Sequence, residues 1–266
     1  MTDTNAINVS TLFDLSGKTA LVTGGSRGIG KMIAEGFLQA GATVYISSRK
    51  ASVSDAVAAE LSSLGPCHSL PADVADDADR ARLVDALAQQ IDRLDILVNN
   101  AGAAWGAPYD EFPEGGFRKV LELNVTALFF LTRDLTPLLT ITASADDPAR
   151  VINIGSMDGL HVPTVLQTGT FPYSASKAAV HHLTRTLAIE LAPRHITVNA
   201  VAPGFFESKM TEASLANFQD QIERNCPLGR IGRPEEMAGV AIYLASRAGA
   251  YTNGTVIPVD GGTSLA

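Results

Sequence analysis

The fold of this chain is decided by the stretch Thr23-Gly24-Gly25-Ser26-Arg27-Gly28-Ile29-Gly30. A short apolar run at 19–22 precedes it, and a helix-like run at 31–40 follows it. Strand, glycine turn and helix in this order place backbone N–H groups and a helix N-terminus against a phosphate. The spacing is G-x-x-x-G-x-G rather than G-x-G-x-x-G, and alone it is also compatible with an ordinary glycine-rich turn.

The composition is that of a globular protein. The chain has 266 residues, 46% hydrophobic and 18% charged, which suits one large α/β domain. The net charge is −8 and no Lys/Arg run is interleaved with aromatics, so nucleic acid is not an expected partner. No secretory signal and no membrane-length apolar run is present, and Cys67 and Cys226 have no metal-ligand spacing. We therefore expect a cytoplasmic protein with free thiols, no metal and no membrane contact.

Strand-like and helix-like runs alternate along the whole chain. This alternation predicts a single-domain Rossmann fold, α/β in class, with a doubly wound, seven-stranded parallel sheet and helices on both faces. The expected strands are 19–22, 43–47, 67–70, 94–98, 151–154, 197–201 and 256–259. The expected helices are 27–40, 52–64, 76–91, 115–140, 174–192 and 234–246. Residues 1–14 are expected to form an N-terminal arm, and 15–266 the domain.

Two stretches depart from the alternation, at 157–172 and at 203–226. Both follow expected strands, and such sheets bind ligands beyond the carboxyl ends of their strands. Both should therefore border the ligand site, with 203–226 as a lid over the substrate.

The residues after the second expected strand favour NADP over NAD. An acidic residue here would bind the adenine ribose hydroxyls, whereas an arginine suits a 2′-phosphate. The chain has Ser48 and Arg49 with no acid between 43 and 50, and Arg27 adds a second positive charge. The alternative is that Arg49 is a solvated loop residue.

Amides mark two further positions. A buried strand ends in Asn99-Asn100-Ala101-Gly102, where small residues admit a flat ring, although an Asx-type turn without a ligand is equally possible. Asn124 lies inside an expected helix, where asparagine is unfavourable because it competes for backbone hydrogen bonds. It could also be a surface residue.

Tyr173 and Lys177 form the expected acid/base pair. They are four residues apart, so they share a helix face, and Ser156 directly follows a buried strand. An ammonium close to a tyrosine should lower its pKa and make it a usable general acid/base. Tyr45 and Tyr243 also have a basic residue four positions later, so the spacing alone is weak.

Taken together and in order, these motifs resemble the short-chain dehydrogenase/reductase family over about residues 15–262. The resemblance also covers 232–235 and 259–262, which look like the C-terminal signatures of the family. It implies four catalytic residues: Asn124, Ser156, Tyr173 and Lys177. It implies NADP(H) contacts at Gly24, Ser26, Arg27, Gly28, Ile29, Gly30, Ser48, Arg49, Asp73, Val74, Asn100, Ala101, Gly102, Tyr173, Lys177, Pro203 and Gly204.

Within the family the chain looks nearest to NADP-dependent 3-oxoacyl (β-ketoacyl) reductases. The resemblance implies hydride transfer between NADP(H) and a ketone or secondary alcohol, and a homotetramer or homodimer. One departure is that 17 positions separate Ser156 from Tyr173, a longer gap than the family usually shows. The alternatives are a polyol or sugar-acid dehydrogenase, and a cofactor-binding interaction protein whose redox site is unused.

Overall fold

The computed structural model describes residues 8–163 and 169–266, and its centre is a seven-stranded parallel sheet. The strand order is β3-β2-β1-β4-β5-β6-β7, so β2 and β3 lie on one side of β1, and β4 and the later strands lie on the other, with β4 parallel to β1. The strands are β1 (Thr19–Thr23), β2 (Thr43–Ser47), β3 (Cys67–Ser69), β4 (Ile96–Asn99), β5 (Ala149–Ile154), β6 (Ile196–Pro203) and β7 (Val256–Val259). The predicted fold class is confirmed; β2 and β7 have the expected boundaries, and the ends of the other strands differ from the expected ones by at most two residues.

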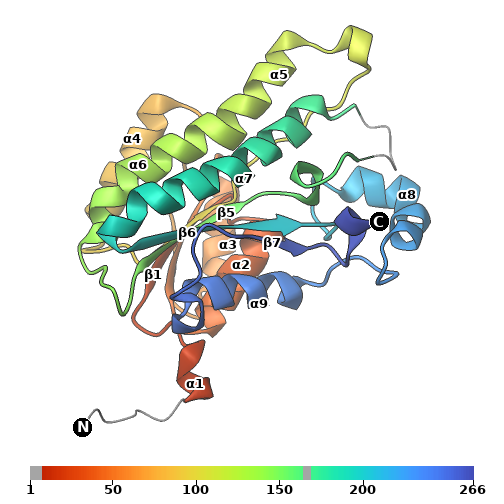
Figure 1. The fold of residues 1–266 in the computed structure, drawn as a ribbon. Helices are drawn as coiled ribbons and strands as arrows, with labels where there is room; N and C mark the ends of the chain where they lie inside the picture. The colour runs from red at the N-terminus through yellow and green to blue at the C-terminus, as the bar shows by residue number, and fades with distance from the viewer. Residues whose placement is uncertain (1–7, 164–168) are drawn as a thin grey trace.

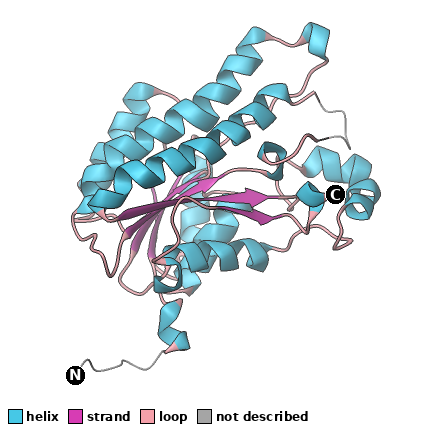
Figure 2. Ribbon diagram, viewed as in Figure 1, coloured by secondary structure: helices cyan, strands magenta, loops and turns pink. Residues whose placement is uncertain are grey.

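Helices cover both faces of the sheet (Figures 1 and 2). One face carries α2 (Gly28–Gln39), α3 (Ala51–Leu61) and α9 (Pro234–Ala245). The other carries α4 (Asp77–Ala88), α5 (Glu114–Leu121), α6 (Ala127–Thr140) and α7 (Phe171–Leu191). Each layer has its own apolar core, with Phe37 and Met237 on the first face and Leu131 and Leu187 on the second. Burying both faces explains why the strands read as continuous apolar runs.

Two helices lie outside the expected set. The short α1 (Val9–Leu12) precedes Leu15, which is fully buried. The longer α8 (Glu212–Asn225) falls inside the 203–226 stretch, where the sequence predicted no regular element. The sequence of α8 lacks a clear helical pattern of apolar residues, because Ile222 is the one residue that this helix buries. Phe218 within it also has non-helical backbone angles. Figure 1 shows α8 beside the C-terminus, at the end of the sheet toward which β6 and β7 point.

Single-turn helices join several elements. They are η1 (Tyr109–Glu111), η3 (Met157–Gly159), η4 (Ala192–Arg194), η5 (Arg247–Gly249) and η6 (Thr263–Leu265). No helix in the described ranges has both the length and the apolar character needed to cross a membrane.

The expected single helix at 115–140 is interrupted. A π-helical segment, η2 (Glu122–Thr126), separates α5 from α6. Such a turn inserts an extra residue into the helix and changes the direction of nearby side chains. Asn124 lies at the middle of this segment and is buried. The regular α-helix is therefore interrupted at Asn124, the residue that the sequence indicates is unfavourable inside a helix.

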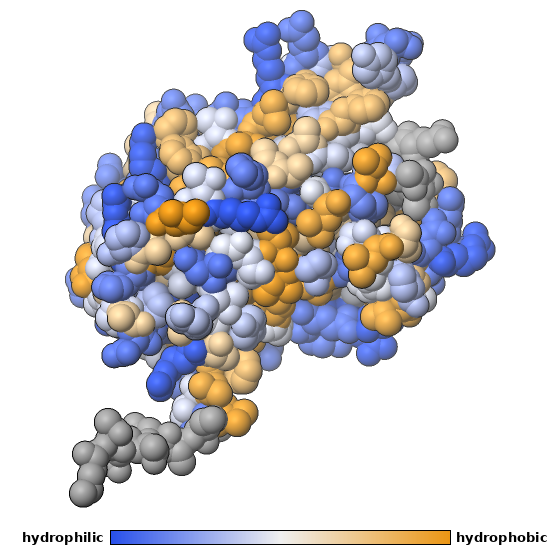
Figure 3. All heavy atoms as spheres, viewed as in Figure 1, coloured by the Kyte–Doolittle hydropathy of each residue, from blue (hydrophilic) through white to orange (hydrophobic). Residues whose placement is uncertain are grey.

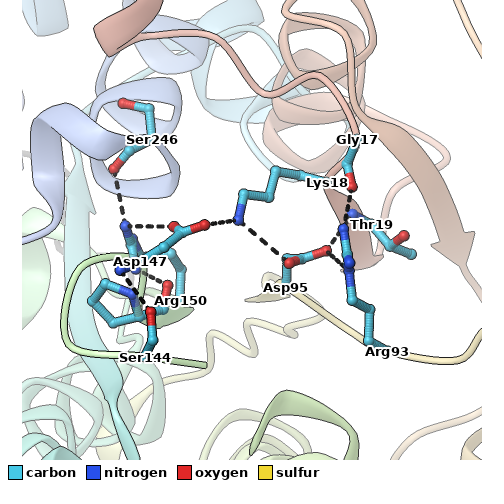
Figure 4. Close-up of polar contacts among 10 residues, drawn as sticks. Gly17, Lys18, Thr19, Arg93, Asp95, Ser144, Asp147, Arg150 and Ser246 are labelled. Carbon is cyan, nitrogen blue, oxygen red and sulfur yellow. Dashed lines mark hydrogen bonds and ion pairs between the residues drawn. The ribbon is translucent and has the colours of Figure 1, made fainter. Parts of the chain in front are cut away.

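The amino ends of the central strands are joined by a charged network (Figure 4). The carboxylate of Asp95 accepts the Thr19 backbone N–H at 2.9 Å, and Lys18 and Arg93 each lie 3.4 Å from it. Lys18 also pairs with Asp147, which lies 3.7 Å from the buried guanidinium of Arg150. The network ties β1, β4 and β5 together at the edge opposite the expected ligand site.

We expect Asp95→Ala to destabilise the protein without affecting ligand binding. The change leaves the Thr19 N–H unpaired and removes a carboxylate that is 7% exposed. A buried donor without a partner costs about 1–3 kcal/mol. Denaturant unfolding should show this loss, and Asp92→Ala, at an exposed position of the same loop, should change stability by less than about 0.5 kcal/mol. Equal stability of the two variants would contradict the assignment.

Candidate active site

The glycine loop forms a cradle at the start of α2. Gly24 and Gly28 have φ of +66° and +53°, which glycine adopts without strain. A Cβ at position 24 would lie 2.7 Å from Nδ2 of Asn100, and one at Gly30 would collide with the same atom. The N-cap residue Arg27 makes no side-chain capping bond, so the first N–H groups of α2 remain available to a phosphate. The loop thus has the geometry of a phosphate cradle.

Asn100 and Thr23 hold this loop against the end of β4. Nδ2 of Asn100 donates to the carbonyl oxygens of Thr23 and Gly24, at 2.8 and 3.2 Å. Oγ1 of Thr23 accepts the backbone N–H groups of Asn100 and Ala101, both at 3.0 Å. Asn100 therefore does more than form a local Asx-type turn, which was the alternative that the sequence left open, because its side chain also binds the glycine loop. The role of Thr23 was missed, since a threonine ending a strand carries no distinctive sequence signal.

The residues proposed for the adenine end lie at the carboxyl ends of β2 and β3. Oγ of Ser48 is buried and has no hydrogen-bond partner within the described part of the chain. The side chain of Arg49 is 58% exposed, and its Nη1 lies 4.0 Å from a carboxylate oxygen of Asp73. Val74 is buried and Arg27 is exposed. An unpaired hydroxyl followed directly in the chain by an accessible guanidinium group fits an anionic ligand.

Asn124 points inward from η2, and its side chain is 2% exposed, so it is not a surface residue. Its Oδ1 accepts the Ala103 N–H at 2.8 Å, and its Nδ2 donates to the Ala103 carbonyl at 3.0 Å. Nδ2 also donates to Oγ of Ser176 at 2.9 Å, a contact that the sequence analysis did not anticipate. These bonds fix the chain after β4 relative to α7.

Ser156, Tyr173 and Lys177 meet beside Asn124. Nζ of Lys177 is buried, donates to the Ile154 carbonyl at 2.7 Å and lies 5.5 Å from the ring centre of Tyr173. The Tyr173 hydroxyl is hydrogen-bonded to Ser156, whose Oγ accepts the Asp158 N–H at 3.1 Å. A Cβ at Gly102 would lie 3.3 Å from Oδ1 of Asn124 and 3.7 Å from Nζ of Lys177. The structure therefore brings the four residues together.

The pKa of the tyrosine differs from the expectation. Burial raises the pKa of Tyr173 to about 12, an effect that the Ser156 hydrogen bond opposes and Asp158 reinforces. Burial also lowers the pKa of Lys177 to about 8, against the attraction of Asp158. The expectation that Lys177 lowers the pKa of Tyr173 is wrong for this geometry. Nζ of Lys177 lies 5.5 Å from the ring centre and donates to the Ile154 carbonyl, and the pKa of Tyr173 is set instead by burial, Ser156 and Asp158.

The segment after β6 closes over the glycine loop. The Gly204 N–H donates to the Val259 carbonyl at 2.9 Å, and a Cβ at position 204 would lie 2.7 Å from Cα of Asp260. Pro203 ends β6 at the same point. A Cβ at Gly28 would lie 2.9 Å from Cβ of Ser208, so this segment contacts the predicted phosphate cradle.

The 157–172 stretch is described only in part. Residues 164–168, which include Val165 and Leu166, lie outside the described residues. On their C-terminal side, Phe171 packs edge-on against Tyr109 and Phe112, with ring centres 5.8 and 5.9 Å apart. Phe171, two residues before Tyr173, therefore belongs to an aromatic cluster.

The remaining candidates are structural. Tyr45 stacks on His68, and the Tyr243 hydroxyl lies 2.7 Å from Oγ1 of Thr252, so neither joins the site. Cys67 and Cys226 are free, buried thiols. Within residues 8–163 and 169–266, no group of three or more His, Cys, Asp or Glu could hold a metal ion.

Comparison with known proteins gives a consistent result. The family model described as enoyl-(acyl carrier protein) reductase matches residues 24–264. The chain is 51% identical, over 95% of its length and 98% of the relative's, to the rhamnolipids biosynthesis 3-oxoacyl-[acyl-carrier-protein] reductase of Pseudomonas aeruginosa. It is 35% identical, over 96% of its length and 98% of the relative's, to the 5-keto-D-gluconate 5-reductase of Escherichia coli.

The solved structure of the Pseudomonas aeruginosa RhlG/NADP active-site complex superimposes with a TM-score of 0.92 at 50% identity, covering 96% of this chain and 99% of that one. Fold, ordered motifs and relatives agree, and this chain therefore belongs to the short-chain dehydrogenase/reductase family.

Proposed function

We propose that this protein is an NADPH-dependent carbonyl reductase that interconverts a ketone and a secondary alcohol. The observation that carries the proposal is the meeting of Tyr173, Ser156 and Lys177 at the carboxyl ends of β4 and β5, beside the cradle at α2. A proton donor, a neighbouring hydroxyl and a buried ammonium are the groups that carbonyl reduction requires.

The residues present fit an NADP cofactor. The free N–H groups at the start of α2 suit its pyrophosphate, and Ser48, Arg49 and Arg27 suit its 2′-phosphate. The remaining proposed contacts are those already named at Asp73, Val74, Asn100–Gly102 and Pro203-Gly204. When bound, the cofactor supplies the hydride. The relative of known structure is named as an NADP complex, which supports this choice.

Each polar group of the site has a proposed role. Tyr173 holds the proton that the developing alkoxide takes, and Ser156 donates a hydrogen bond to the same oxygen. Lys177 holds the nicotinamide ribose and gives the site positive potential. Asn124 positions the loop at Ala103 and a water that links Lys177 to solvent. In alcohol oxidation Tyr173 accepts the proton instead.

A 3-oxoacyl or other moderately apolar ketone is the substrate that we propose. The 51% identical relative is named as a 3-oxoacyl reductase, and Leu160 and Phe171 are exposed near the site. We further propose that the 157–172 stretch, of which residues 164–168 lie outside the described part of the chain, forms one wall of the substrate pocket, and that 203–226 is the opposing lid, which excludes water from the reaction. The contact between Ser208 and Gly28 supports the lid.

A polyol or sugar-acid dehydrogenase remains a second candidate, since relatives at 34 and 35% identity are named gluconate 5-dehydrogenase and 5-keto-D-gluconate 5-reductase. A cofactor-binding interaction protein would not need all four catalytic groups in contact. A turnover panel of 3-oxoacyl thioesters, cyclic ketones and keto-sugars, followed by NADPH absorbance, separates these possibilities. Preference for keto-sugars would favour the second candidate, and no turnover would favour the third.

We propose a homotetramer or homodimer that forms through α5, α6 and α7. Phe117, Phe129 and Ile189 on these helices are exposed, and Figure 3 shows apolar side chains gathered over α5 and the adjoining part of α7. Contiguous apolar surface of this kind marks an interaction site. Light scattering would measure the assembly. The free thiols support a cytoplasmic location.

We expect NADPH to be preferred over NADH by at least about tenfold in kcat/KM, since a charge-assisted phosphate contact can supply ~1.4 kcal/mol. Arg49→Asp should narrow or reverse this preference. Arg194→Asp, in η4 before β6 and therefore at the far edge of the sheet, is the matched control. Steady-state kinetics with both cofactors provide the measurement, and equal use of NADPH and NADH by the unmodified protein would refute the prediction.

Tyr173→Phe should retain NADPH binding and lose nearly all turnover. The ring still packs, but the proton donor is gone, and general acid catalysis contributes about 10²–10⁴-fold. Tyr243→Phe is the control, because Tyr243 shares the spacing to a basic residue but bonds Thr252 instead. Cofactor titration and turnover measure the two properties separately. Substantial activity of Tyr173→Phe would remove this residue from the mechanism.

The two directions of the reaction should differ in pH dependence. Because the pKa of Tyr173 is raised to about 12, its hydroxyl stays protonated at neutral pH. Ketone reduction should therefore be constant between about pH 6 and 7.5 and fall above pH 8, where Lys177 loses its proton. Alcohol oxidation needs the phenolate and should rise over the same lower range. A reduction rate that increases with pH would oppose this assignment.

A further inference from the structure

His181 lies one helical turn after Lys177 on α7 and is 3% exposed. Its ring fills the space next to two glycines that flank Ser156 in the chain. A Cβ at Gly155 would collide with Nε2 of His181, and one at Gly159 would lie 2.7 Å from its Cε1. The imidazole ring therefore occupies the space that the two glycines leave free. The proposed mechanism does not assign this ring a role.

The imidazole contacts the backbone of the proposed catalytic serine. The Ser156 N–H donates to Nε2 of His181 over 3.4 Å. The other ring nitrogen, Nδ1, is buried and has no hydrogen-bond partner within residues 8–163 and 169–266. Since Nε2 accepts, the proton of the neutral ring must lie on Nδ1.

The electrostatic surroundings keep the ring neutral. Burial lowers the pKa of His181 to about 4, and the positive charges of Lys177 and Arg185 on the same helix lower it further, against the Gly159 backbone. From η3, the Asp158 carboxyl faces Lys177. At neutral pH Nε2 is therefore an acceptor rather than a second donor directed at the Ser156 N–H.

We propose that His181 is a positioning residue, which fixes the backbone of Ser156 so that the serine hydroxyl faces the reacting oxygen. Ser156 is then held at two points, by Nε2 at its N–H and by the Asp158 N–H at its Oγ. With Oγ accepting from Asp158, the hydroxyl proton is left to donate. This inference rests on the proposed function, since it concerns the same reaction.

Four variants test the position of the acceptor. His181→Gln places an amide oxygen near the position of Nε2, His181→Asn places polar atoms only near Nδ1, and His181→Leu keeps bulk without an acceptor. His182→Leu, at an exposed position of the same helix, is the control. For each, kcat, the KM of ketone and of NADPH, and the free energy of unfolding are measured.

We expect the Leu and Asn variants to lose ~10–100-fold in kcat, the effect of a displaced group in a preorganised site. The KM for NADPH should stay within about twofold, because His181 is not among the residues proposed to hold the cofactor. The Gln variant should recover most of the kcat. A merely structural role would affect stability without this split, and a Leu variant with unmodified kcat, or a Gln variant no better than Leu, would overturn the proposal.

Measurements without turnover keep this test separate from the proposed function. Nitrogen chemical shifts of the His181 ring should show the proton on Nδ1, and the Ser156 amide should be protected from hydrogen exchange in the unmodified protein but not in His181→Leu. A proton on Nε2 would refute the hydrogen bond even if every variant folds poorly. Failure of the unmodified protein to reduce any ketone would instead reject the proposed function and leave the positioning of Ser156 as measured.

Discussion

The hydrogen bonds between the end of β4 and the glycine loop are the constraint on which the site depends. Asn100 donates to the Thr23 and Gly24 carbonyls, and Thr23 accepts the N–H groups that follow β4. The same amide fills the space where Gly24 and Gly30 would carry a Cβ, so these positions must remain glycine. The parallel sheet brings the two strand ends together, and the side chains convert that proximity into a rigid cradle with free N–H groups.

A second set of bonds attaches the catalytic helix to this cradle. The π-helical segment turns Asn124 inward, where it binds Ala103 and Ser176 at once. Lys177 anchors to the Ile154 carbonyl at the end of β5. The proposed catalytic side chains are thus positioned by strand ends and one helix face rather than by flexible loops. This arrangement suits a reaction that requires an accurately oriented proton donor.

The two edges of the sheet perform different tasks. The amino edge holds the charged network in which ion pairs connect Asp95, Lys18, Asp147 and Arg150 (Figure 4). The carboxyl edge contains Oγ of Ser48, which has no hydrogen-bond partner among the described residues, together with shifted pKa values at Tyr173 and Lys177. Shifted pKa values of this kind are typical of functional sites, which supports the carboxyl edge as the candidate site.

The sequence by itself determined the sheet, its layers and the residues that would meet. Apolar runs of strand length that alternate with helical runs allow few other arrangements, and ordered motifs place Ser156, Tyr173 and Lys177 at known strand and helix ends. Tertiary structure alone decided what each group experiences. The raised pKa of Tyr173 depends on how deeply packing buries its hydroxyl and on the neighbouring Ser156 and Asp158, which i,i+4 spacing does not fix. The π-helical break, the helix α8 and the contact of His181 with Ser156 likewise depend on packing between segments far apart in the chain, about which local sequence patterns carry no information.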